Sequence, residues 1–132
     1  MGVQKLEKEL LITQFNIYQF LLYHKRAPLY FPYIESVLAD HDVPNDFKYL
    51  TLAESGLRTD AVSHAGAAGI WQFIPETARR YGLTVNEFID ERYHFKKSSI
   101  AAAKYLAYIH DLLARNGYED GSWTLTAAAY NR

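Results

Sequence analysis

The stretch YLTLAESGL, residues 49–57, sets a charged side chain among apolar ones. Phe47, Leu50 and Glu54 are spaced three and then four apart, so on a helix they share one face. Gly56 is typical of the position just past a helix end, which puts Glu54 in the last turn. Burial and the negative end of the helix dipole both raise the pKa of a carboxyl there. A carboxyl that stays protonated near neutral pH can give a proton to a leaving oxygen.

Taken alone, this segment leaves a plainer interpretation open. A glutamate at a helix end is most often a solvated surface residue, because glutamate is rarely buried. Only the sequence that follows Glu54 favours the catalytic interpretation.

The composition limits the class of protein. A chain of 132 residues with 49% hydrophobic and 22% charged residues is expected to form one compact domain with a buried core. Fourteen basic against fifteen acidic residues give a formal net charge of −1, which argues against general nucleic-acid binding. There is no cysteine, which excludes disulfides and thiolate metal sites. His64 and His110 have no partners at ligand spacing, so we predict no metal site.

The apolar spacing predicts a mainly helical chain. The prolines of APLYFPY, residues 27–33, should interrupt a first helix of residues 5–25 and begin a second one that ends near Asp40. Asn45 or Asp46 should cap the third helix, which carries the opening stretch.

The second half of the chain alternates breakers with further helical segments. Residues 57–70 contain glycines and serines with little periodicity, which predicts an irregular loop or short strands. The spacing of Thr84 and Glu87 is that of a capping box and predicts another short turn. Helices are expected over residues 75–82, 97–116 and 122–131.

Several motifs in a fixed order resemble one enzyme family. They are YFPYIESVLADHDVPNDFKYLTLAES (30–55), ESGLRTDAVSHAGAAGIWQFIPETARRYGL (54–83), SSIAAAKYL (98–106) and AAAYN (127–131). Together they resemble the catalytic core of the lytic transglycosylases of the lysozyme-like superfamily, in particular the membrane-bound type D branch. The resemblance implies a mainly α, lysozyme-like (goose-type) single domain over residues 1–132, with residues 1–25 forming a helix outside the core match.

The resemblance implies a role for each matched position. Glu54 would be the single general acid/base. It would protonate the β-1,4 glycosidic oxygen between N-acetylmuramic acid and N-acetylglucosamine, and then deprotonate the muramoyl C6 hydroxyl to give a 1,6-anhydro product. Ser55 would also hold the local turn, and Tyr130 could bond to the Glu54 carboxyl. The positions that the resemblance assigns to substrate binding are Ser55, Ser63, Gln72, Ile74, Tyr105, Tyr130 and Asn131.

The residues themselves leave alternatives to these roles. Gln72 could be an ordinary buried amide, although its motif favours substrate contact. Trp71 and Phe73 are predicted to be core residues, since both flank a position that should face the groove. For Tyr105, packing and sugar binding are equally supported.

The resemblance also implies a setting. Peptidoglycan glycan strands are the expected partner, with no cofactor, a monomeric state and a place in the periplasm or cell envelope. No segment has the apolar length of a membrane span, and Met1-Gly2 suggests an expression start that replaces an export signal. The sequence stops at Arg132 inside its last motif, so we expect a C-terminal truncation. The alternatives are a hydrolytic muramidase, a non-catalytic cell-wall glycan-binding domain and a cytosolic helical interaction domain.

Overall fold

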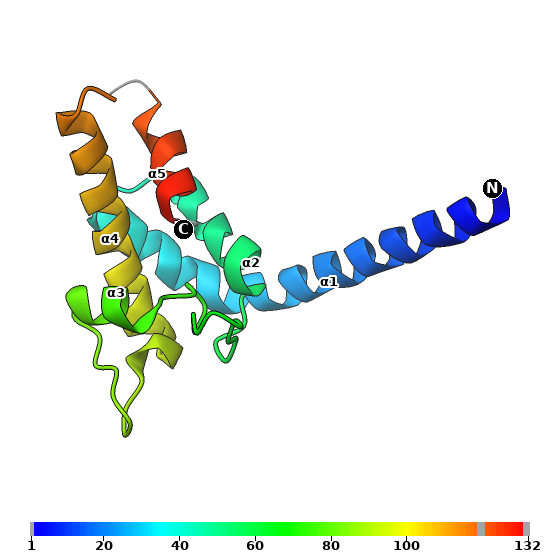
Figure 1. Cartoon of the computed structure of the whole chain (residues 1–132), viewed down its shortest axis with the longest axis horizontal. Coiled ribbons are helices and arrows are strands. Elements are labelled where there is room, and N and C mark those ends of the chain that lie inside the picture. Colours follow the sequence, from blue (N-terminus) through cyan, green and yellow to red (C-terminus); the bar gives the residue numbers. More distant parts are fainter. Residues whose placement is uncertain (1, 119–120, 131–132) are drawn as a thin grey trace.

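The computed structural model describes the backbone of residues 2–118 and 121–130, and side chains from residue 17 onward within those ranges, except at 18 and 19. Figure 1 shows helices gathered into one body, with the first half of α1 projecting from it. Along the described ranges the helical elements are α1 (Gly2–Asp40), η1 (Asn45–Tyr49), α2 (Leu50–Ser55), α3 (Pro75–Arg80), η2 (Glu91–Tyr93), α4 (Phe95–Arg115) and α5 (Ser122–Tyr130), where η marks a 3₁₀-helix. The described residues form isolated β-bridges and no strand, which confirms the mainly α prediction.

The predicted interruption at residues 27–33 is wrong, because α1 runs unbroken from Gly2 to Asp40 with Pro28 and Pro32 inside it. Both prolines lie on the exposed side of the helix, so water can reach the backbone carbonyls that they leave without a donor. The opposite side carries Ile34 and Leu38, which are fully buried. Burial of this face outweighs the missing hydrogen bonds, and the helix bends where it joins the body (Figure 1).

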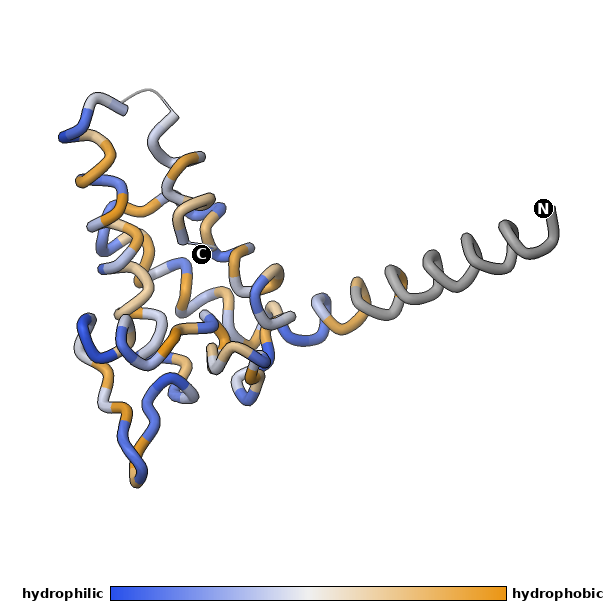
Figure 2. The backbone as a smooth tube through the Cα atoms, viewed as in Figure 1, coloured by the Kyte–Doolittle hydropathy of each residue, from blue (hydrophilic) through white to orange (hydrophobic). Residues whose placement is uncertain are grey.

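The core lies where α4 packs against α5 and α1. Leu106 and the run Ala101–Ala103 are buried on α4, and the small alanines let the neighbouring helices approach closely. Figure 2 shows apolar and polar stretches alternating along α4, as expected for a helix with one buried face. The helix predicted over residues 97–116 is therefore confirmed, with α4 running from Phe95 to Arg115.

The helix that carries Glu54 begins differently from the prediction. Residues Asn45–Tyr49 form a 3₁₀-helix that leads into α2, and Pro44 occupies the N-cap without a side-chain hydrogen bond. The predicted caps, Asn45 and Asp46, therefore do not act as caps. The end of α2 is as predicted, since Gly56 follows it in the left-handed conformation with φ 63°.

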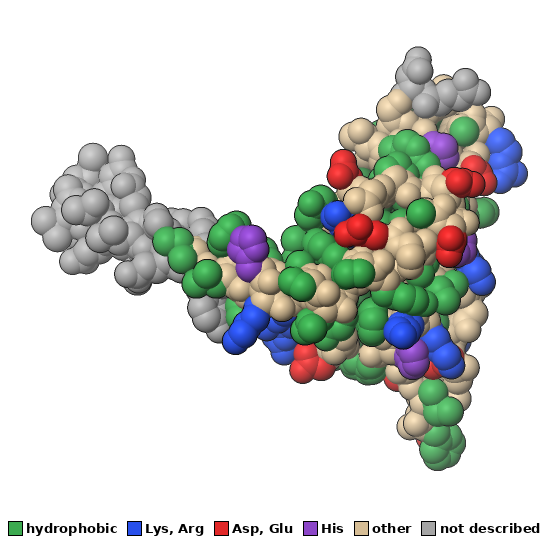
Figure 3. Space-filling view, turned by 180° about the vertical axis from the view of Figure 1, so that it is seen from behind, with side chains coloured by type: hydrophobic (Ala, Val, Ile, Leu, Met, Phe, Trp, Pro, Cys, Tyr) green, Lys and Arg blue, Asp and Glu red, His purple; other side chains and the backbone are tan. Residues whose placement is uncertain are grey.

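The irregular segment predicted over residues 57–70 is present and extends to residue 74, with bridges from Val62 to Ala68 and from Ala68 to Phe73. The capping box at Thr84 and Glu87 does not form. Instead, Asn86 closes a tight turn by accepting hydrogen bonds from the backbone N–H groups of the two residues that follow Glu87. This turn extends away from the body (Figure 1), and hydrophobic side chains gather at its tip (Figure 3). None of the helices in the described part of the chain is long and apolar enough to cross a membrane.

Candidate active site

Two pockets meet beside the end of α2. The α1-side pocket, of about 560 Å³, is lined by Leu22, Tyr23, Arg26, Ala53, Glu54, Ser55, Gly56, Arg58, Ala61, Val62, Ser63 and Gln72. The α3-side pocket, of about 370 Å³, is lined by Glu54, Ser63, Ala65, Ala67, Gln72, Phe73, Ile74, Thr77, Tyr105 and Tyr130. Glu54, Ser63 and Gln72 line both pockets, so these two pockets adjoin along one groove.

Glu54 lies half-buried at the junction of the two pockets. Glu54 lies on the face of α2 that points toward the core, where Phe47 is buried and Leu50 is partly buried. Burial raises the pKa of the Glu54 carboxyl above its ordinary value of 4.5. Among the described residues that line the two pockets, Glu54 is the only carboxylate. The groove therefore offers one carboxyl that holds its proton more tightly than an exposed glutamate does.

The turn after Glu54 is fixed from two sides. The Ser55 hydroxyl lies 2.9 Å from the Thr51 carbonyl oxygen and 2.7 Å from the Ile70 carbonyl oxygen, and so ties α2 to the irregular segment. Arg26 of α1 donates from Nη1 to the Gly56 carbonyl at 2.9 Å. Ser55 is thus placed to hold the turn, with its donor used by backbone carbonyls.

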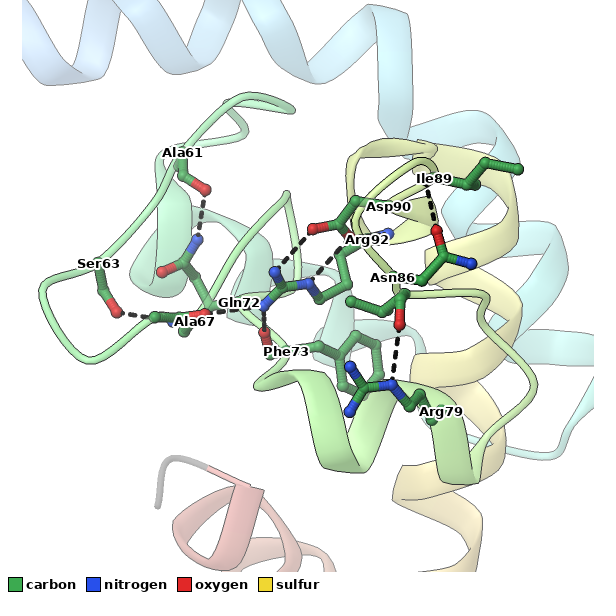
Figure 4. A network of polar contacts seen from close by, with 12 residues as sticks. Ala61, Ser63, Ala67, Gln72, Phe73, Arg79, Asn86, Ile89, Asp90 and Arg92 are labelled. Atoms are coloured by element: carbon green, nitrogen blue, oxygen red, sulfur yellow. Dashed lines mark hydrogen bonds and ion pairs between the residues drawn. The ribbon is translucent and has the colours of Figure 1, made fainter.

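Ser63 and Gln72 both bond within the irregular segment, and Figure 4 shows the Ser63 side chain directed to Ala67 and the Gln72 amide directed to Ala61. The Ser63 hydroxyl oxygen accepts from the Ala67 N–H at 3.0 Å, which leaves its proton available. Gln72 has a positive φ of 53°, and its amide nitrogen donates to the carbonyls of Ala61 at 3.1 Å and Gly69 at 2.8 Å. These bonds turn the amide nitrogen inward and leave the amide oxygen as the polar end with capacity to accept.

Arg92 clamps this segment from behind (Figure 4). Its Nη1 donates to the Gly66 carbonyl at 2.7 Å and to the Phe73 carbonyl at 3.0 Å. The same guanidinium pairs with Asp90 at 2.7 Å, and this hydrogen-bonded pair lowers the pKa of the Asp90 carboxyl. Arg92 is only 8% exposed, so its partners within the structure satisfy its charge and its donors.

Aromatic rings form the inner wall of the α3-side pocket. The Tyr105 ring lies 5.0 Å from that of Tyr81 and 5.4 Å from that of Tyr130, so Tyr105 both packs and lines the pocket. The Tyr130 hydroxyl donates to the Trp71 carbonyl at 2.7 Å, which corrects the expected bond to Glu54. Burial, followed by the nearby charge of Glu54, raises the pKa of Tyr130 well above its ordinary value. As predicted, Trp71 is a core residue; it is fully buried.

Ile74 and Asn131 are the two other residues predicted to bind substrate. Ile74, 46% exposed, lines the α3-side pocket at the start of α3. Asn131 lies outside the described residues. The predicted residues that lie within the described ranges thus meet in one groove, with Ser55 serving the turn.

Sequence reasoning missed the wall that α1 contributes. Leu22, Tyr23 and Arg26 line the α1-side pocket together with Arg58. The half-buried positions 22, 23, 26, 27 and 30 follow helical spacing, which is the signal that could have found this wall. The supposed break at residues 27–33 concealed it, because it separated this helix from the domain.

Comparison with known proteins agrees with this arrangement. The model of the Transglycosylase SLT domain family matches residues 32–132. The chain is 36% identical over 106 residues to membrane-bound lytic murein transglycosylase D of Escherichia coli, both in strain K12 and in O6:H1 (strain CFT073 / ATCC 700928 / UPEC). It is 29% identical over 106 residues to a putative tributyltin chloride resistance protein of Alteromonas sp. (strain M-1). The match covers 80% of this chain, 22% of each Escherichia coli protein and 48% of the Alteromonas protein.

The mainly helical fold and the groove with one half-buried carboxyl define the class of protein: a lysozyme-like domain. Within that class, the chain belongs to the Transglycosylase SLT domain family. The resemblance stated from the sequence is thereby confirmed. The chain spans about a fifth of the length of the Escherichia coli relatives that it matches.

Proposed function

We propose that this domain is a peptidoglycan lytic transglycosylase in which Glu54 is the single general acid/base. One observation carries the proposal: the half-buried Glu54, with its raised pKa, is the only carboxylate among the described residues lining the two adjoining pockets. Ordinary retaining and inverting glycosidases need a second carboxylate as nucleophile or base. Family membership supports the same substrate class.

The reaction balances without a water molecule. The Glu54 carboxyl donates its proton to the glycosidic oxygen, and the bond from the muramoyl anomeric carbon to that oxygen breaks. The N-acetyl group supports the positive charge that develops at the anomeric carbon. The Glu54 carboxylate then takes the proton of the C6 hydroxyl while that oxygen bonds to the anomeric carbon. The products are a 1,6-anhydromuramoyl end and a free 4-hydroxyl, and Glu54 is protonated again.

Neighbouring residues hold the glycan in this geometry. The Ser63 proton and the Gln72 amide oxygen are the complementary donor and acceptor for sugar hydroxyl and acetamido groups. Ile74 offers apolar contact and Tyr105 an aromatic wall. Ser55 and Tyr130 act as positioning residues, since their hydroxyls bond to backbone carbonyls next to the groove. Peptidoglycan as substrate places the protein at the cell envelope.

Product analysis in ¹⁸O-labelled water tests the reaction type. Purified peptidoglycan is incubated with the protein and the released muropeptides are analysed by mass spectrometry. We expect anhydro ends, lighter than reducing ends by one water and free of label. Labelled reducing ends would contradict the proposal and identify a muramidase. Strand binding without any product would identify a glycan-binding domain.

A further inference from the structure

The α1-side pocket carries an excess of positive charge. Arg26 and Arg58 line it together with Glu54, whose burial favours the neutral carboxyl. At a pH where Glu54 is protonated, the lining holds two guanidinium groups and no formal negative charge. Figure 3 shows basic side chains on α1 near its junction with the body. The proposed acid/base chemistry uses neither arginine, so both side chains are available to bind another part of the substrate in the same pocket as Glu54.

Arg26 is anchored in a way that leaves donors for a ligand. One guanidinium nitrogen, Nη1, donates to the Gly56 carbonyl at 2.9 Å. The guanidinium has five N–H donors in a rigid fork, so one edge can be fixed while another binds. Among the described side chains no carboxylate forms an ion pair with Arg26. The half-buried group is therefore oriented in advance toward the pocket.

Arg58 lies on the outer rim of the same pocket. It pairs with Asp60 at 3.4 Å, and both side chains are largely exposed, at 56% and 77%. Exposed pairs of this kind contribute little free energy, so a ligand can compete for Arg58. Asp60 is not among the residues that line the pocket. The pocket thus offers two arginines to an anion.

We propose that Arg26 and Arg58 bind a carboxylate carried by the lactyl arm of a muramoyl unit that occupies the α1-side pocket. A planar carboxylate matches the guanidinium fork, while the sugar rings themselves are uncharged. This inference rests on the proposed function, because it names a specificity determinant of the same groove. Two sources of the carboxylate exist: the stem peptide attached to the lactyl group, and the lactyl acid itself where the peptide has been removed.

Binding of matched charged and neutral strands tests the inference. Glycan strands are prepared with stem peptides and after enzymatic removal of the peptides. One half of each preparation is amidated to neutralise its carboxylates. Affinity is measured by calorimetry with Glu54→Gln, which keeps the groove but should not cleave. We expect the charged member of at least one pair to bind about tenfold more tightly, the size of a charge-assisted hydrogen bond.

Second substitutions locate this selectivity. In the Glu54→Gln background, Arg26→Gln and Arg58→Gln should each reduce the preference for charged strands. Arg26→Lys should keep part of this preference. Lys25→Gln removes the same charge from the neighbouring exposed position of α1 and should leave the selectivity unchanged. Because Arg58 is exposed, its variant tests the pocket even if Arg26→Gln weakens the fold. Selectivity confined to one pair of strands assigns the carboxylate to the peptide or to the lactyl acid.

The inference is overturned if neither pair shows selectivity, or if both arginine variants weaken charged and neutral strands equally. Cleavage of peptidoglycan by the parent without charge selectivity would overturn the inference and leave the proposed function standing. Charge-selective binding by a parent that releases no product would support the arginine pocket and contradict the transglycosylase.

Discussion

At the scale of single residues, Glu54 is placed where a carboxylate is unfavourable. Its side chain is half-buried at the end of α2, and this burial raises the pKa of the carboxyl above its ordinary value. The groove therefore disfavours the ionised form of Glu54 at a cost in stability, as is usual for functional groups. The same property makes the carboxyl a usable acid.

Replacing Glu54 by Gln should stabilise the fold near neutral pH. The folded-state pKa is raised, so the folded protein holds the proton more tightly than the unfolded chain. The contribution of Glu54 to stability is therefore fully present below its ordinary pKa, and it is lost as the pH rises through the pKa of Glu54 in the folded state. Thermal unfolding of parent and Glu54→Gln from pH 4 to pH 8 should show Tm values that separate increasingly with pH, with the variant higher. Parallel curves would contradict a raised pKa.

Residue-level prediction from the sequence worked where neighbours along one helix decide the environment. The spacing of Phe47, Leu50 and Glu54 predicted that the carboxyl shares a face with apolar residues, and the motifs that follow were needed to favour a functional position over a solvated one. It failed for Tyr130, whose hydroxyl bonds to the carbonyl of Trp71, a residue 59 positions away. Local spacing carries no information about a partner that only the folded chain brings near.

At the scale of elements, the irregular segment of residues 57–74 is held by a close approach of two backbones. A Cβ built on Gly69 would lie 1.9 Å from the Arg92 carbonyl oxygen, and φ there is +82°. Gly66, in the same segment, has a φ of +87° but nothing within 4 Å of such a Cβ. The two glycines thus share a backbone conformation and differ in the space around them.

This difference predicts unequal effects of the same substitution. Gly66→Ala should cost about 1 kcal/mol of unfolding free energy, the cost of left-handed backbone for an L-residue. Gly69→Ala should cost at least about 3 kcal/mol, because it adds a clash with backbone that cannot move aside freely. Urea unfolding monitored by tryptophan fluorescence measures both. Equal losses would contradict the close approach.

Element boundaries could be predicted where the signal was local, as at Gly56 and Gly117, which follow helices with a positive φ. The prolines of α1 led to a wrong boundary at residues 27–33. The hydrogen bonds that they remove can be read from the local sequence, whereas the burial that outweighs this loss depends on α4 and the rest of the core. The same error hid the contribution of Arg26 to the groove.

At the scale of the whole molecule, the pair of Asp90 and Arg92 joins η2 to the segment behind the groove. Hydrogen bonding to Arg92 lowers the pKa of Asp90, and Lys97 lowers that of Glu91 to about 2. Both groups release protons more readily in the folded state. Their stabilisation is therefore present above the ordinary pKa values and is lost as pH falls below about 5.

Asp90→Asn should reduce stability at pH 7 by about 2–3 kcal/mol, because it leaves the charge of buried Arg92 without its partner. The free energy of unfolding of this variant should also fall less steeply as the pH is lowered than that of the parent. Asp60→Asn removes the same charge from an exposed pair and should change stability by less than about 1 kcal/mol. Denaturant titrations at pH 3 to pH 7 compare the two, and equal effects would contradict the clamp.

The groove as a whole combines α1, α2, the irregular segment, α3, α4 and α5. Its motif-bearing residues could be predicted because a family resemblance ties them to one site. The wall from α1 lies outside that match, which begins at residue 32, so the family resemblance does not reach it and the helical spacing of its residues is the remaining sequence signal.

In the proposed reaction, Glu54 alone supplies both the acid and the base. Glu76 provides a matched control, because it is exposed in the first turn of α3, lies 3.7 Å from Arg80 and lines neither pocket. The decisive measurement is the rate of anhydromuropeptide release from peptidoglycan by the parent, Glu54→Gln and Glu76→Gln, with strand binding measured in parallel. We predict a loss of about a thousandfold for Glu54→Gln with binding retained, and a rate within about twofold of the parent for Glu76→Gln. Substantial release by Glu54→Gln, or an equal loss in Glu76→Gln, would contradict this account.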